Sequence, residues 1–518
     1  MRMTWPRVLP RQDSRRLAGG SARRGVMVVA AAGIAVACAG LLTGAGSAPA
    51  AAARAMTAAF RWGRAEAVPG LAALNKTGDA SVTSLACWSV NNCTAGGYYD
   101  AATVSGTSTL SKARAFVVAE RKGRWARAVQ VPGLAAVNAG GLAQVTSVSC
   151  APRGYCIAGG YYTDASGQRQ GFVMTAVKGR WRAAVKVAGL AALGTGGSEV
   201  SSVSCPGAGV CAAAGSYTDA AGSQGFVTNQ VKNVWGAAQA VPGLAALNTY
   251  GRAQVISVSC GSAGNCAAGG SYQTNPYGAG GLAQPFVASE QNGVWGMAEE
   301  VPGLAALNTY GGAQVSSVSC ARDGYCAAGG YFTPATTDGE WQYAVPFVTS
   351  GSNGSWGTAA EWKFFYGDAV PNYIDSVSCP SAGNCTAVGY VSDYGPDGQD
   401  QAFAASQKNG AWGTPENLPG VRAEGDPTSL SCPSAGDCAA GGGYIPEADL
   451  TNGRSLPFVA SQTKGRWASA ELYPGTTALD KGKNAQVRSV SCPSAGHCTA
   501  AGFYTDAKGH RQAFVSGP

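Results

Sequence analysis

Residues 145–162 read VTSVSCAPRGYCIAGGYY, and this stretch decides the fold. Apolar and small polar residues alternate from Val145 to Cys150, which is the pattern of a strand with one buried face. Proline and glycine then mark a turn, and Cys156 opens a second run of small residues that ends on Tyr162. The stretch therefore predicts two antiparallel strands joined by a tight turn, with one cysteine on each side of the turn.

The same pattern occurs eight times, and the first cysteines of successive copies lie 53 to 63 residues apart. Sixteen of the 17 cysteines belong to these copies, and the remaining one is Cys38. The pairs are Cys87 with Cys93, Cys150 with Cys156, Cys205 with Cys211, Cys260 with Cys266, Cys320 with Cys326, Cys379 with Cys385, Cys432 with Cys438 and Cys492 with Cys498. Self-similarity at this period indicates a repeat architecture.

Each copy continues with two more predicted strands. An apolar third strand, such as 401–403, leads through a glycine turn into a fourth strand that begins at a tryptophan. These tryptophans are Trp62, Trp125, Trp181, Trp235, Trp295, Trp356, Trp412 and Trp467. Four short antiparallel strands per repeat are typical of a β-propeller blade.

The two ends of the repeat region indicate a closed ring. The last copy stops within its third strand at 514–518, while 61–69 form a fourth strand that no other strand precedes. Pairing these two ends would remove the open sheet edges at the seam. We therefore expect an all-β fold over residues 58–518: an eight-bladed β-propeller of four-stranded antiparallel blades, closed by the N-terminal strand joining the last blade.

Three packing roles follow from the repeat. Alanine and glycine in the second strand would let the blades approach near the axis, and the aromatic residue six positions after the second cysteine would fill the wider gap further out. The Pro-Gly-Leu-Ala-Ala-Leu-Asn segments, such as 242–248, would be buried over the sheet ends.

The first 50 residues are predicted to be a secretory signal peptide. Residues 1–25 carry seven arginines and one acid, an apolar run follows at 26–42, and Ala48-Pro49-Ala50 is a small-x-small cleavage signal. Export by the Sec or the Tat route and a lipid anchor at Cys38 stay open.

Removal of seven positive charges and one negative charge would lower the formal charge from +8 to +2. This near neutrality favours no nucleic-acid partner, and no segment after residue 50 is apolar for long enough to form a membrane span. We expect a short linker at 51–57 and a mature chain that is secreted, extracellular or cell-wall associated.

The cysteine pairs are predicted to be disulfides. Zinc needs four closely placed ligands, whereas each repeat offers two cysteines and the whole chain has two histidines. Paired cysteines across a turn in a secreted chain are typical of disulfide bonds. Each bond would close a seven-residue loop, for which loop-closure entropy gives about 2.4 kcal/mol. We expect no metal site and no cofactor.

The repeated unit Ser-Val-Ser-Cys-x5-Cys-x-Ala-x-Gly, followed by Gly-x-Trp, resembles the secreted repeat proteins of high-GC actinobacteria over about residues 58–518. This resemblance implies a propeller and no defined activity. More distantly, 406–412 and 461–467 are similar to the Asp-box turn of sialidase-like propellers. The aspartate of that box is absent and the Gly-to-Trp spacing is one residue short, so sialidase chemistry does not carry over.

Residues for catalysis are sparse. His497 and His510 lie in one repeat without a nucleophile motif and are interpreted as surface or turn residues. Most repeats are near-copies, whereas an enzyme propeller usually gathers dissimilar residues from many blades. The first hypothesis is a non-catalytic propeller that binds a glycan or a cell-surface protein at or near the cell envelope. A glycoside-active enzyme and a purely structural surface protein are the alternatives.

The repeat breaks its own pattern in one sector, at 338–343, 361–368 and 393–400. In a four-stranded blade these connections emerge on the same face, and aromatic rings beside carboxylates suit carbohydrate or protein recognition. The candidate ligand-binding residues are Trp341, Tyr343, Trp362, Phe365, Tyr366, Asp393, Tyr394 and Asp397. Alternatively, the aromatic residues fill the space vacated by leucine and the acids solvate a loop. A weak calcium site at Asp393, Asp397 and Asp400 is a further alternative.

Overall fold

The computed structural model describes residues 60–76, 78–101, 112–274, 283–308, 311–334, 344–362, 372–391, 401–421, 424–446, 449 and 453–517. The chain divides into two units, Met1–Thr57 and Ala58–Pro518, and all described residues belong to the second. The signal peptide expected at 1–50 and the linker at 51–57 lie outside the described residues and stay predictions.

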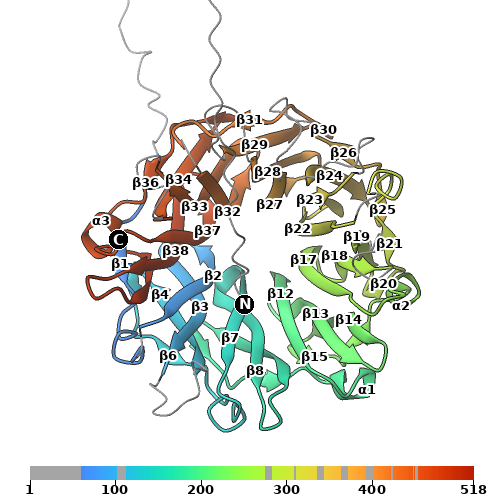
Figure 1. Ribbon diagram of the computed structural model, residues 1–518, viewed down its shortest axis with the longest axis horizontal. Helices are drawn as coiled ribbons and strands as arrows, with labels where there is room; N and C mark the ends of the chain where they lie inside the picture. Colours follow the sequence, from blue (N-terminus) through green and yellow to red (C-terminus); the bar gives the residue numbers. More distant parts are fainter. Residues whose placement is uncertain are drawn as a thin grey trace, which may run out of the picture. The chain divides into compact units, whose positions relative to one another are not determined.

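The second unit is a ring of eight antiparallel sheets, as Figure 1 shows. The first strand of each blade is innermost and contacts the first strand of the next blade, and that of blade 8 contacts that of blade 1. The predicted eight-bladed β-propeller is therefore confirmed.

The strands of the blades follow one another from the axis outward. The first strands are β2 (Ala80–Ser89), β7 (Ala143–Ala151), β12 (Ser198–Gly207), β17 (Gln254–Ser262), β22 (Gln314–Cys320), β27 (Asn372–Ser381), β32 (Glu424–Ser434) and β37 (Gln486–Ser494). The second strands are β3 (Asn92–Asp100), β8 (Tyr155–Thr163), β13 (Val210–Asp219), β18 (Asn265–Gln273), β23 (Tyr325–Phe332), β28 (Asn384–Val391), β33 (Asp437–Ile445) and β38 (His497–Thr505). The third strands are β4 (Ala113–Arg121), β9 (Arg169–Val177), β14 (Gly222–Val231), β19 (Ala283–Gln291), β24 (Val345–Ser352), β29 (Gln401–Lys408), β34 (Leu456–Thr463) and β39 (Arg511–Ser516).

The fourth strand differs from the sequence expectation in seven blades. It consists of two short segments that pair with the same third strand, and the tryptophan ends the first segment instead of opening a continuous strand. The first segments are β5 (Arg124–Trp125), β10 (Arg180–Trp181), β15 (Val234–Trp235), β20 (Val294–Trp295), β25 (Ser355–Trp356), β30 (Ala411–Trp412) and β35 (Arg466–Trp467). The second segments are β6 (Val129–Gln130), β11 (Val185–Lys186), β16 (Gln239–Ala240), β21 (Glu299–Glu300), β26 (Ala360–Glu361), β31 (Glu416–Asn417) and β36 (Glu471–Leu472).

The break in the fourth strand has a physical cause in the neighbouring blade. The N–H group just before the second segment donates to a carbonyl in the preceding connection, as Ala128 does to Pro69 at 2.8 Å and Ala298 to Pro242 at 2.7 Å. The N–H groups at these positions bond to the neighbouring connection rather than to the third strand, which ties successive blades together at their outer edges.

Ring closure uses the first described strand. β1 (Ala65–Ala67) pairs antiparallel with β39 of blade 8, with Ala65 opposite Ser516 and Ala67 opposite Phe514. The N-terminal strand thus completes the last blade, as the sequence predicts.

The two serines of the Ser-Val-Ser-Cys motif join neighbouring blades near the axis. The hydroxyl of the first serine accepts a hydrogen bond from a backbone N–H of the next blade at all eight seams, at 2.9–3.2 Å. The hydroxyl of the second serine accepts from the N–H of the next blade's first cysteine at seven seams. In blade 1 Ala86 stands at this second position. The motif therefore supplies partners for N–H groups that the sheets themselves leave unpaired.

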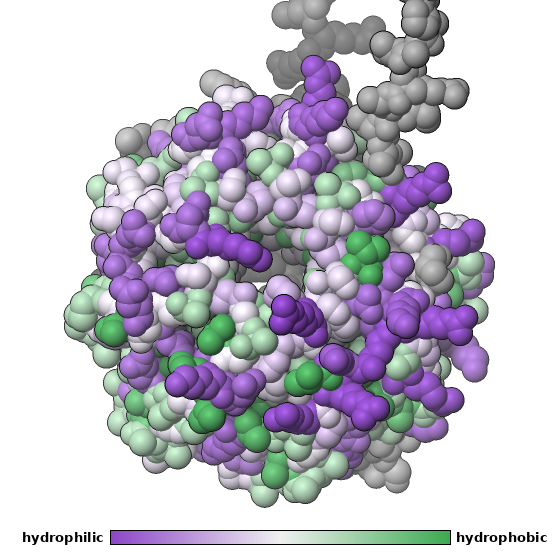
Figure 2. Space-filling model, turned by 180° about the vertical axis from the view of Figure 1, so that it is seen from behind, coloured by the Kyte–Doolittle hydropathy of each residue, from purple (hydrophilic) through white to green (hydrophobic). Residues whose placement is uncertain are grey.

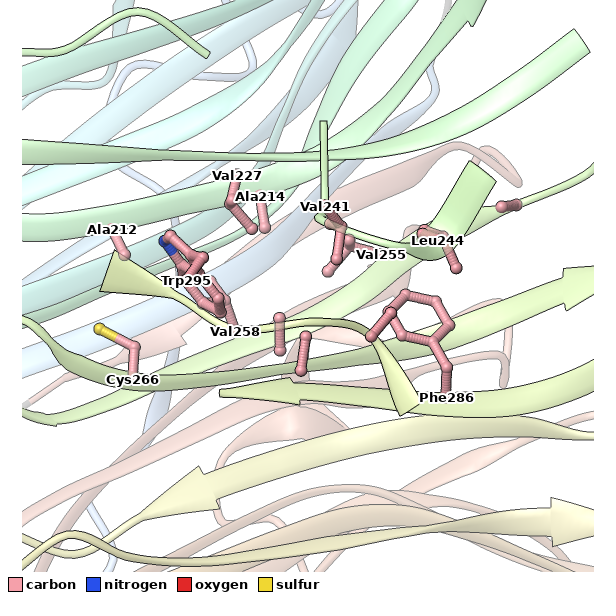
Figure 3. Packing of buried hydrophobic residues seen from close by; sticks show 14 of the residues in the cluster. Ala212, Ala214, Val227, Val241, Leu244, Val255, Val258, Cys266, Phe286 and Trp295 are labelled. Atoms are coloured by element: carbon pink, nitrogen blue, oxygen red, sulfur yellow. The ribbon is translucent and has the colours of Figure 1, made fainter. Parts of the chain in front are cut away.

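Apolar side chains fill the seams between blades. Figure 3 shows the seam of blades 3 and 4, where Phe286, Trp295 and Val255 pack with Ala212 and Ala214. Every third strand carries a phenylalanine that is at most 1% exposed: Phe116, Phe172, Phe226, Phe286, Phe347, Phe403, Phe458 and Phe514.

The packing roles expected of the second strand are confirmed. A Cβ added to Gly159 would lie 2.5 Å from a Val200 methyl carbon of the next blade, so this approach requires glycine. Further out, Tyr99, Tyr272 and Phe332 are buried at the predicted aromatic position.

The eight predicted disulfides are all present, each across the turn between the first and second strands, with Cα atoms 3.9–4.3 Å apart. They join Cys87 with Cys93, Cys150 with Cys156, Cys205 with Cys211, Cys260 with Cys266, Cys320 with Cys326, Cys379 with Cys385, Cys432 with Cys438 and Cys492 with Cys498. We call the face that carries these turns the lower face. The upper face carries the connections from second to third strand and from one blade to the next.

The second cysteine of each pair is directed into the packed interior of the ring. It is buried in seven blades, at Cys93, Cys156, Cys211, Cys266, Cys385, Cys438 and Cys498. In blade 5 Cys326 is half-buried and packs against the apolar cluster of the seam. The cysteines therefore have a structural role, because a buried, bonded sulfur is not available to a ligand.

The blade-to-blade connections are anchored over the sheet ends. Leu244 is buried, and the Asn248 side-chain amide donates to Ser223 O and Gln224 Oε1 while its Oδ1 accepts from the N–H of Gln273. Single helical turns occur in these connections at α1 (Leu190–Leu193), α2 (Leu244–Leu247) and α3 (Thr476–Leu479), whereas the 3₁₀ turn η1 (Pro152–Gly154) joins β7 to β8 on the lower face. Hydrogen bonds to the sheet ends therefore hold the blade-to-blade connections in place on the upper face.

Candidate functional site

Seven of the eight candidate ligand-binding residues lie outside the described residues: Trp341, Tyr343, Phe365, Tyr366, Asp393, Tyr394 and Asp397. The residues of the alternative calcium site also lie there. These assignments therefore stay predictions, and the described residues that flank them define the surroundings.

Trp362 is the one candidate that the structure describes. Its side chain is 8% exposed and packs edge-on against Phe403 at 6.1 Å and Trp412 at 5.7 Å between ring centroids. Its N–H donates to Pro346 O, just as Val131 N–H donates to Ala115 O in blade 1. Trp362 therefore occupies the core position that valine holds in other blades, which favours the space-filling interpretation for this residue.

Three tyrosines gather on the upper face of blades 5 and 6, where the irregular connections begin and end. Tyr331 is the next-to-last residue of β23, Tyr373 is the second residue of β27 and Tyr390 is the next-to-last residue of β28. The Tyr373 ring lies 4.4 Å from that of Tyr331, at a right angle, and 5.2 Å from that of Tyr390. We call these three residues the tyrosine cluster. All three rings are half-buried, so each keeps part of its surface toward solvent.

An acid lies directly beside this cluster. Asp375 follows Tyr373 by two residues on β27, at the position where Thr146 and Thr428 donate a hydroxyl hydrogen bond to the next blade. The Asp375 Oδ2 atom is buried without a hydrogen-bond partner among the described residues. Burial raises the pKa of Asp375 well above its usual range, and the negative charge of Asp426 in blade 7 adds to this. Asp375 can therefore donate a hydrogen bond while it is protonated, and it is a strong acceptor when it is ionised.

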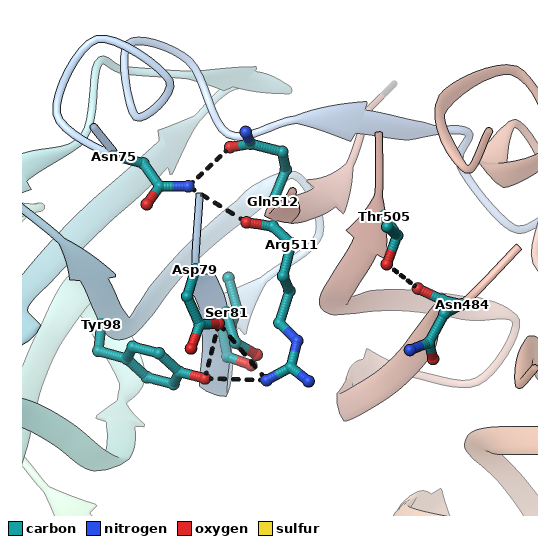
Figure 4. Close-up of polar contacts among 9 residues, drawn as sticks. Asn75, Asp79, Ser81, Tyr98, Asn484, Thr505, Arg511 and Gln512 are labelled. Atoms are coloured by element: carbon teal, nitrogen blue, oxygen red, sulfur yellow. Dashed lines mark hydrogen bonds and ion pairs between the residues drawn. The ribbon is translucent and has the colours of Figure 1, made fainter. Parts of the chain in front are cut away.

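A second group of polar residues lies on the upper face where blade 8 meets blade 1, and Figure 4 shows Arg511, Asp79 and Tyr98 of this group. Arg511 Nη1 lies 3.4 Å from Asp79 Oδ1 and donates to the Tyr98 hydroxyl at 3.3 Å. The Tyr98 hydroxyl lies 3.4 Å from Asp79 Oδ1 and donates to it. The Arg511 guanidinium also lies over the Phe503 ring, 4.6 Å from its centroid.

The backbone beneath Arg511 is held by Asn75, whose side-chain amide donates to Arg511 O at 3.1 Å and to Gln512 Oε1 at 3.0 Å (Figure 4). In the same figure Thr505 donates to Asn484 O at 2.8 Å, which anchors the adjoining connection of blade 8. These hydrogen bonds fix the backbone at the start of β39, from which the Arg511 guanidinium extends.

Arg488 lies on β37, the first strand of blade 8, and its guanidinium lies 5.4 Å from the Phe503 ring centroid. Burial lowers the pKa of Arg488, with the negative charge of Asp426 opposing this. The burial of Asp79 raises the pKa of that carboxyl, although the positive charge of Arg511 opposes the change. Asp426 therefore interacts electrostatically with Asp375 on one side and with Arg488 on the other.

The propeller is hollowed near its axis, and hydrophilic side chains border the hollow in the face shown in Figure 2. Tyr373, Asp375, Asp426 and Arg488 lie near the upper ends of the first strands, which surround this axis, and Asp79 lies just before one of them. Tyr331, Tyr390 and Tyr98 lie on second strands, and Arg511 lies on the third strand of blade 8. We call the set formed by the tyrosine cluster, Asp375, Asp426, Arg488, Arg511, Asp79 and Tyr98 the channel-mouth site.

The ligand-binding residues predicted from the sequence include none of the residues of the channel-mouth site. Tyr373 occupies the position at which other first strands carry Gln144, Gln254 or Gln314. This departure from the repeat could have marked Tyr373 as a candidate from the sequence alone. The grouping of Arg511 with Tyr98 joins residues 413 positions apart, which no local pattern indicates.

The two histidines have the roles expected of turn and surface residues. His510 ends a turn whose N–H groups bond to Asp506, and His497 is exposed at the start of β38. Within the described ranges, no group of three or more His, Cys, Asp or Glu residues is placed to hold a metal ion. No helix in the part of the chain that the structure describes is long and apolar enough to cross a membrane.

No protein-family model matches the chain, and no curated protein is similar to it. Solved structures with a similar fold include an ulvan lyase from a new polysaccharide lyase family, at 10% identity and a TM-score of 0.41, covering 86% of this chain and 95% of the lyase. A Hadza microbial sialidase is 10% identical with a TM-score of 0.38, covering 88% and 99% of the two chains. The β-propeller domain of the Pyrococcus furiosus Trilobed protease is 9% identical with a TM-score of 0.38, covering 72% and 95%.

Proposed function

We propose that this protein is an extracellular β-propeller that binds a glycan at or near the cell envelope, through the channel-mouth site and the irregular connections of blades 5 and 6. The observation that carries this proposal is the tyrosine cluster, because three half-buried rings meet at the strand ends from which those connections extend.

Carbohydrates are recognised by aromatic rings that pack against sugar C–H faces and by polar groups that bond the hydroxyls. The tyrosine cluster offers the rings, while Asp375 offers an oxygen atom without a partner among the described residues. Arg511, held by Asp79 and Tyr98, offers further donors at the same mouth. The predicted ligand residues Trp341, Tyr343 and Tyr394 would add rings on the same face.

An extracellular location is supported by the eight disulfides, since such bonds persist in oxidising compartments. The predicted signal peptide and the resemblance to secreted actinobacterial repeat proteins agree with this location. A glycan of the cell envelope is therefore the ligand that we propose, in preference to a cell-surface protein.

The test is a glycan array that includes bacterial envelope polysaccharides, probed with the secreted chain and with Tyr373→Ala and Trp341→Ala variants. Each substitution should weaken binding about tenfold or more, because a stacked ring contributes on the order of 1 kcal/mol beyond its buried area. Tyr250→Ala is the matched control, since Tyr250 is 42% exposed in the connection between blades 3 and 4. Absence of glycan binding, or binding that both substitutions leave unchanged, would refute the proposal.

A glycoside-active enzyme is the second candidate, and the pairing of Asp375 with Asp426 favours it. Two interacting carboxyls, of which one stays protonated, are the usual acid and base of glycoside cleavage. A turnover screen on the glycans that bind, with Asp375→Asn as the inactive control, separates this candidate from simple binding.

A further inference from the structure

A cavity of about 290 Å³ opens on the lower face where blade 8 meets blade 1. In blade 1 the two-residue turn Lys122-Gly123 joins the third strand to the fourth. In blade 8 no such turn covers this place, because β39 and β1 lie at opposite ends of the propeller sequence. A cavity of about 360 Å³ also opens on the lower face between blades 6 and 7, but only the cavity of the closure seam is bordered by Glu120 and by residues of the N-terminal segment, such as Arg61 and Arg64.

The inner wall of this closure cavity carries a buried acid. Glu120 lines the cavity, is 4% exposed, and has an Oε2 atom without a hydrogen-bond partner among the described residues. Trp62 forms another wall, and its ring is fixed by a hydrogen bond from Nε1 to Ser461 Oγ and by an edge-on contact with Tyr473. The cavity is thus a pre-formed pocket with one unsatisfied acceptor.

Comparison with the other seams shows why Glu120 lacks a partner. Gln407 and Gln462, at the equivalent position four residues after the third-strand phenylalanine, donate to serine hydroxyls of the preceding blade at 3.1 and 3.2 Å. Glu290 at the same position accepts a hydrogen bond from Asn229 of the preceding blade. The residue of blade 8 that stands where Asn229 stands in blade 3 is Gly517, which has no side chain to offer. Glu120 therefore lacks the side-chain hydrogen bond to the preceding blade that Gln407, Gln462 and Glu290 make, although one oxygen of each of these three residues is also without a partner among the described residues.

Charge is distributed unequally between the inner wall and the opening. Arg61, Arg64 and His497 line the cavity and are exposed, whereas Glu120 is buried. A ligand ammonium group would complement the buried carboxylate, and an anionic group on the same ligand would complement the two arginines. A ligand with only positive charge would be repelled by Arg61 and Arg64, and a ligand with only negative charge would be repelled by the Glu120 carboxylate.

We propose that the closure cavity is a binding site for a small zwitterion of the α-amino acid class, with its ammonium group on Glu120 and its carboxylate toward Arg61 and Arg64. This site lies on the face opposite the channel-mouth site, and it goes beyond the glycan binding proposed above.

The titration of Glu120 makes this binding depend on pH. Burial raises the pKa of Glu120 to about 7, and the negative charge of Glu66 on β1 adds to this. The other titratable groups around it are Tyr473 from the preceding connection and the cavity residues Arg61, Arg64 and His497. Because an ammonium group pairs with the ionised form, binding should strengthen as Glu120 loses its proton. Its ionised fraction rises from about 0.1 at pH 6 to about 0.9 at pH 8.

Isothermal titration calorimetry of the full secreted chain with L-alanine, ethylammonium and acetate tests the proposal. We expect L-alanine to bind about tenfold more tightly at pH 8 than at pH 6, ethylammonium to bind more weakly, and acetate not to bind. Glu120→Gln should remove both the affinity at pH 8 and its pH dependence. Glutamine stands at this position in blades 3, 6 and 7, so the variant should fold, and its melting curve verifies this.

Glu290→Gln is the matched control and should leave L-alanine binding unchanged. Replacing Arg61 and Arg64 together by alanine should reduce the affinity for L-alanine to that of ethylammonium. No binding of L-alanine at pH 8, binding that survives Glu120→Gln, or acetate binding as tight as that of L-alanine would each overturn the proposal. None of these outcomes bears on the glycan array, which probes the opposite face.

Discussion

Replacing Glu120 by glutamine should stabilise the propeller at neutral pH and leave its stability unchanged near pH 4. In the folded chain, burial and the nearby Glu66 raise the pKa of Glu120 to about 7 from its usual 4.5. Above pH 4.5 the unfolded chain ionises this carboxyl while the folded chain keeps it protonated. The wild-type protein therefore loses stability between pH 4.5 and pH 7, and the loss is complete above pH 7.

The size of this effect follows from the difference between the two pKa values. Each tenfold change in proton affinity corresponds to 1.36 kcal/mol, so the buried carboxyl costs about 3 kcal/mol at and above neutral pH. For a domain of roughly 460 residues, the unfolding entropy is about 1 kcal/mol per kelvin, and the substitution should raise the melting temperature by about 3 °C.

Melting temperatures of the wild type and of Glu120→Gln, measured from pH 4 to pH 8 in one buffer series, test this. The difference should be near zero at pH 4, grow between pH 4.5 and pH 7, and stay constant above. Glu290→Gln is the control: burial raises the pKa of Glu290 as well, but the hydrogen bond from Asn229 opposes this, so its effect should be smaller. A difference that does not vary with pH, or a Glu120→Gln variant that is less stable at pH 8, would refute the reasoning.

Replacing Cys205 and Cys211 together by serine should lower the free energy of unfolding by about 2 kcal/mol, because the small disulfide loop constrains the unfolded chain; denaturant unfolding without reductant measures this, and an unchanged midpoint would contradict it. Trp362→Ala should cost about 3–5 kcal/mol in the same assay, because it empties a core position, and a cost below about 1 kcal/mol would argue against its burial in solution. A chain that starts at Val68 lacks β1 and leaves the edge of β39 open; it should melt several degrees lower and be cleaved faster by trypsin, whereas an unchanged melting temperature would show that closure does not need this strand.

The repeat pattern predicts some features of the candidate sites and not others. The departures from the repeat at 338–343, 361–368 and 393–400 are visible in the sequence alone, and a binding role for them stays a prediction. The repeat pattern did not distinguish Trp362 from the neighbouring aromatic residues, because whether a ring packs inward depends on the seam with the next blade. Alignment of Trp362 with Val131 would have given a signal, as both follow the fourth-strand tryptophan by six residues.

By itself, the sequence determined the number of blades, the disulfide pairs and the meeting of β1 with β39. The blades and the disulfide pairs repeat at a fixed period, so a local pattern expresses them. The pairing of β1 with β39 follows from a fourth strand without its blade at one end of the repeats and a blade without its fourth strand at the other. Only the tertiary structure decided the role of the paired serines, the break in the fourth strand and the unpartnered acid at the closure seam. Each of these depends on which groups the neighbouring blade supplies across the seam, as with Glu120, for which blade 8 supplies Gly517, and the pattern within one strand does not show what lies across the seam.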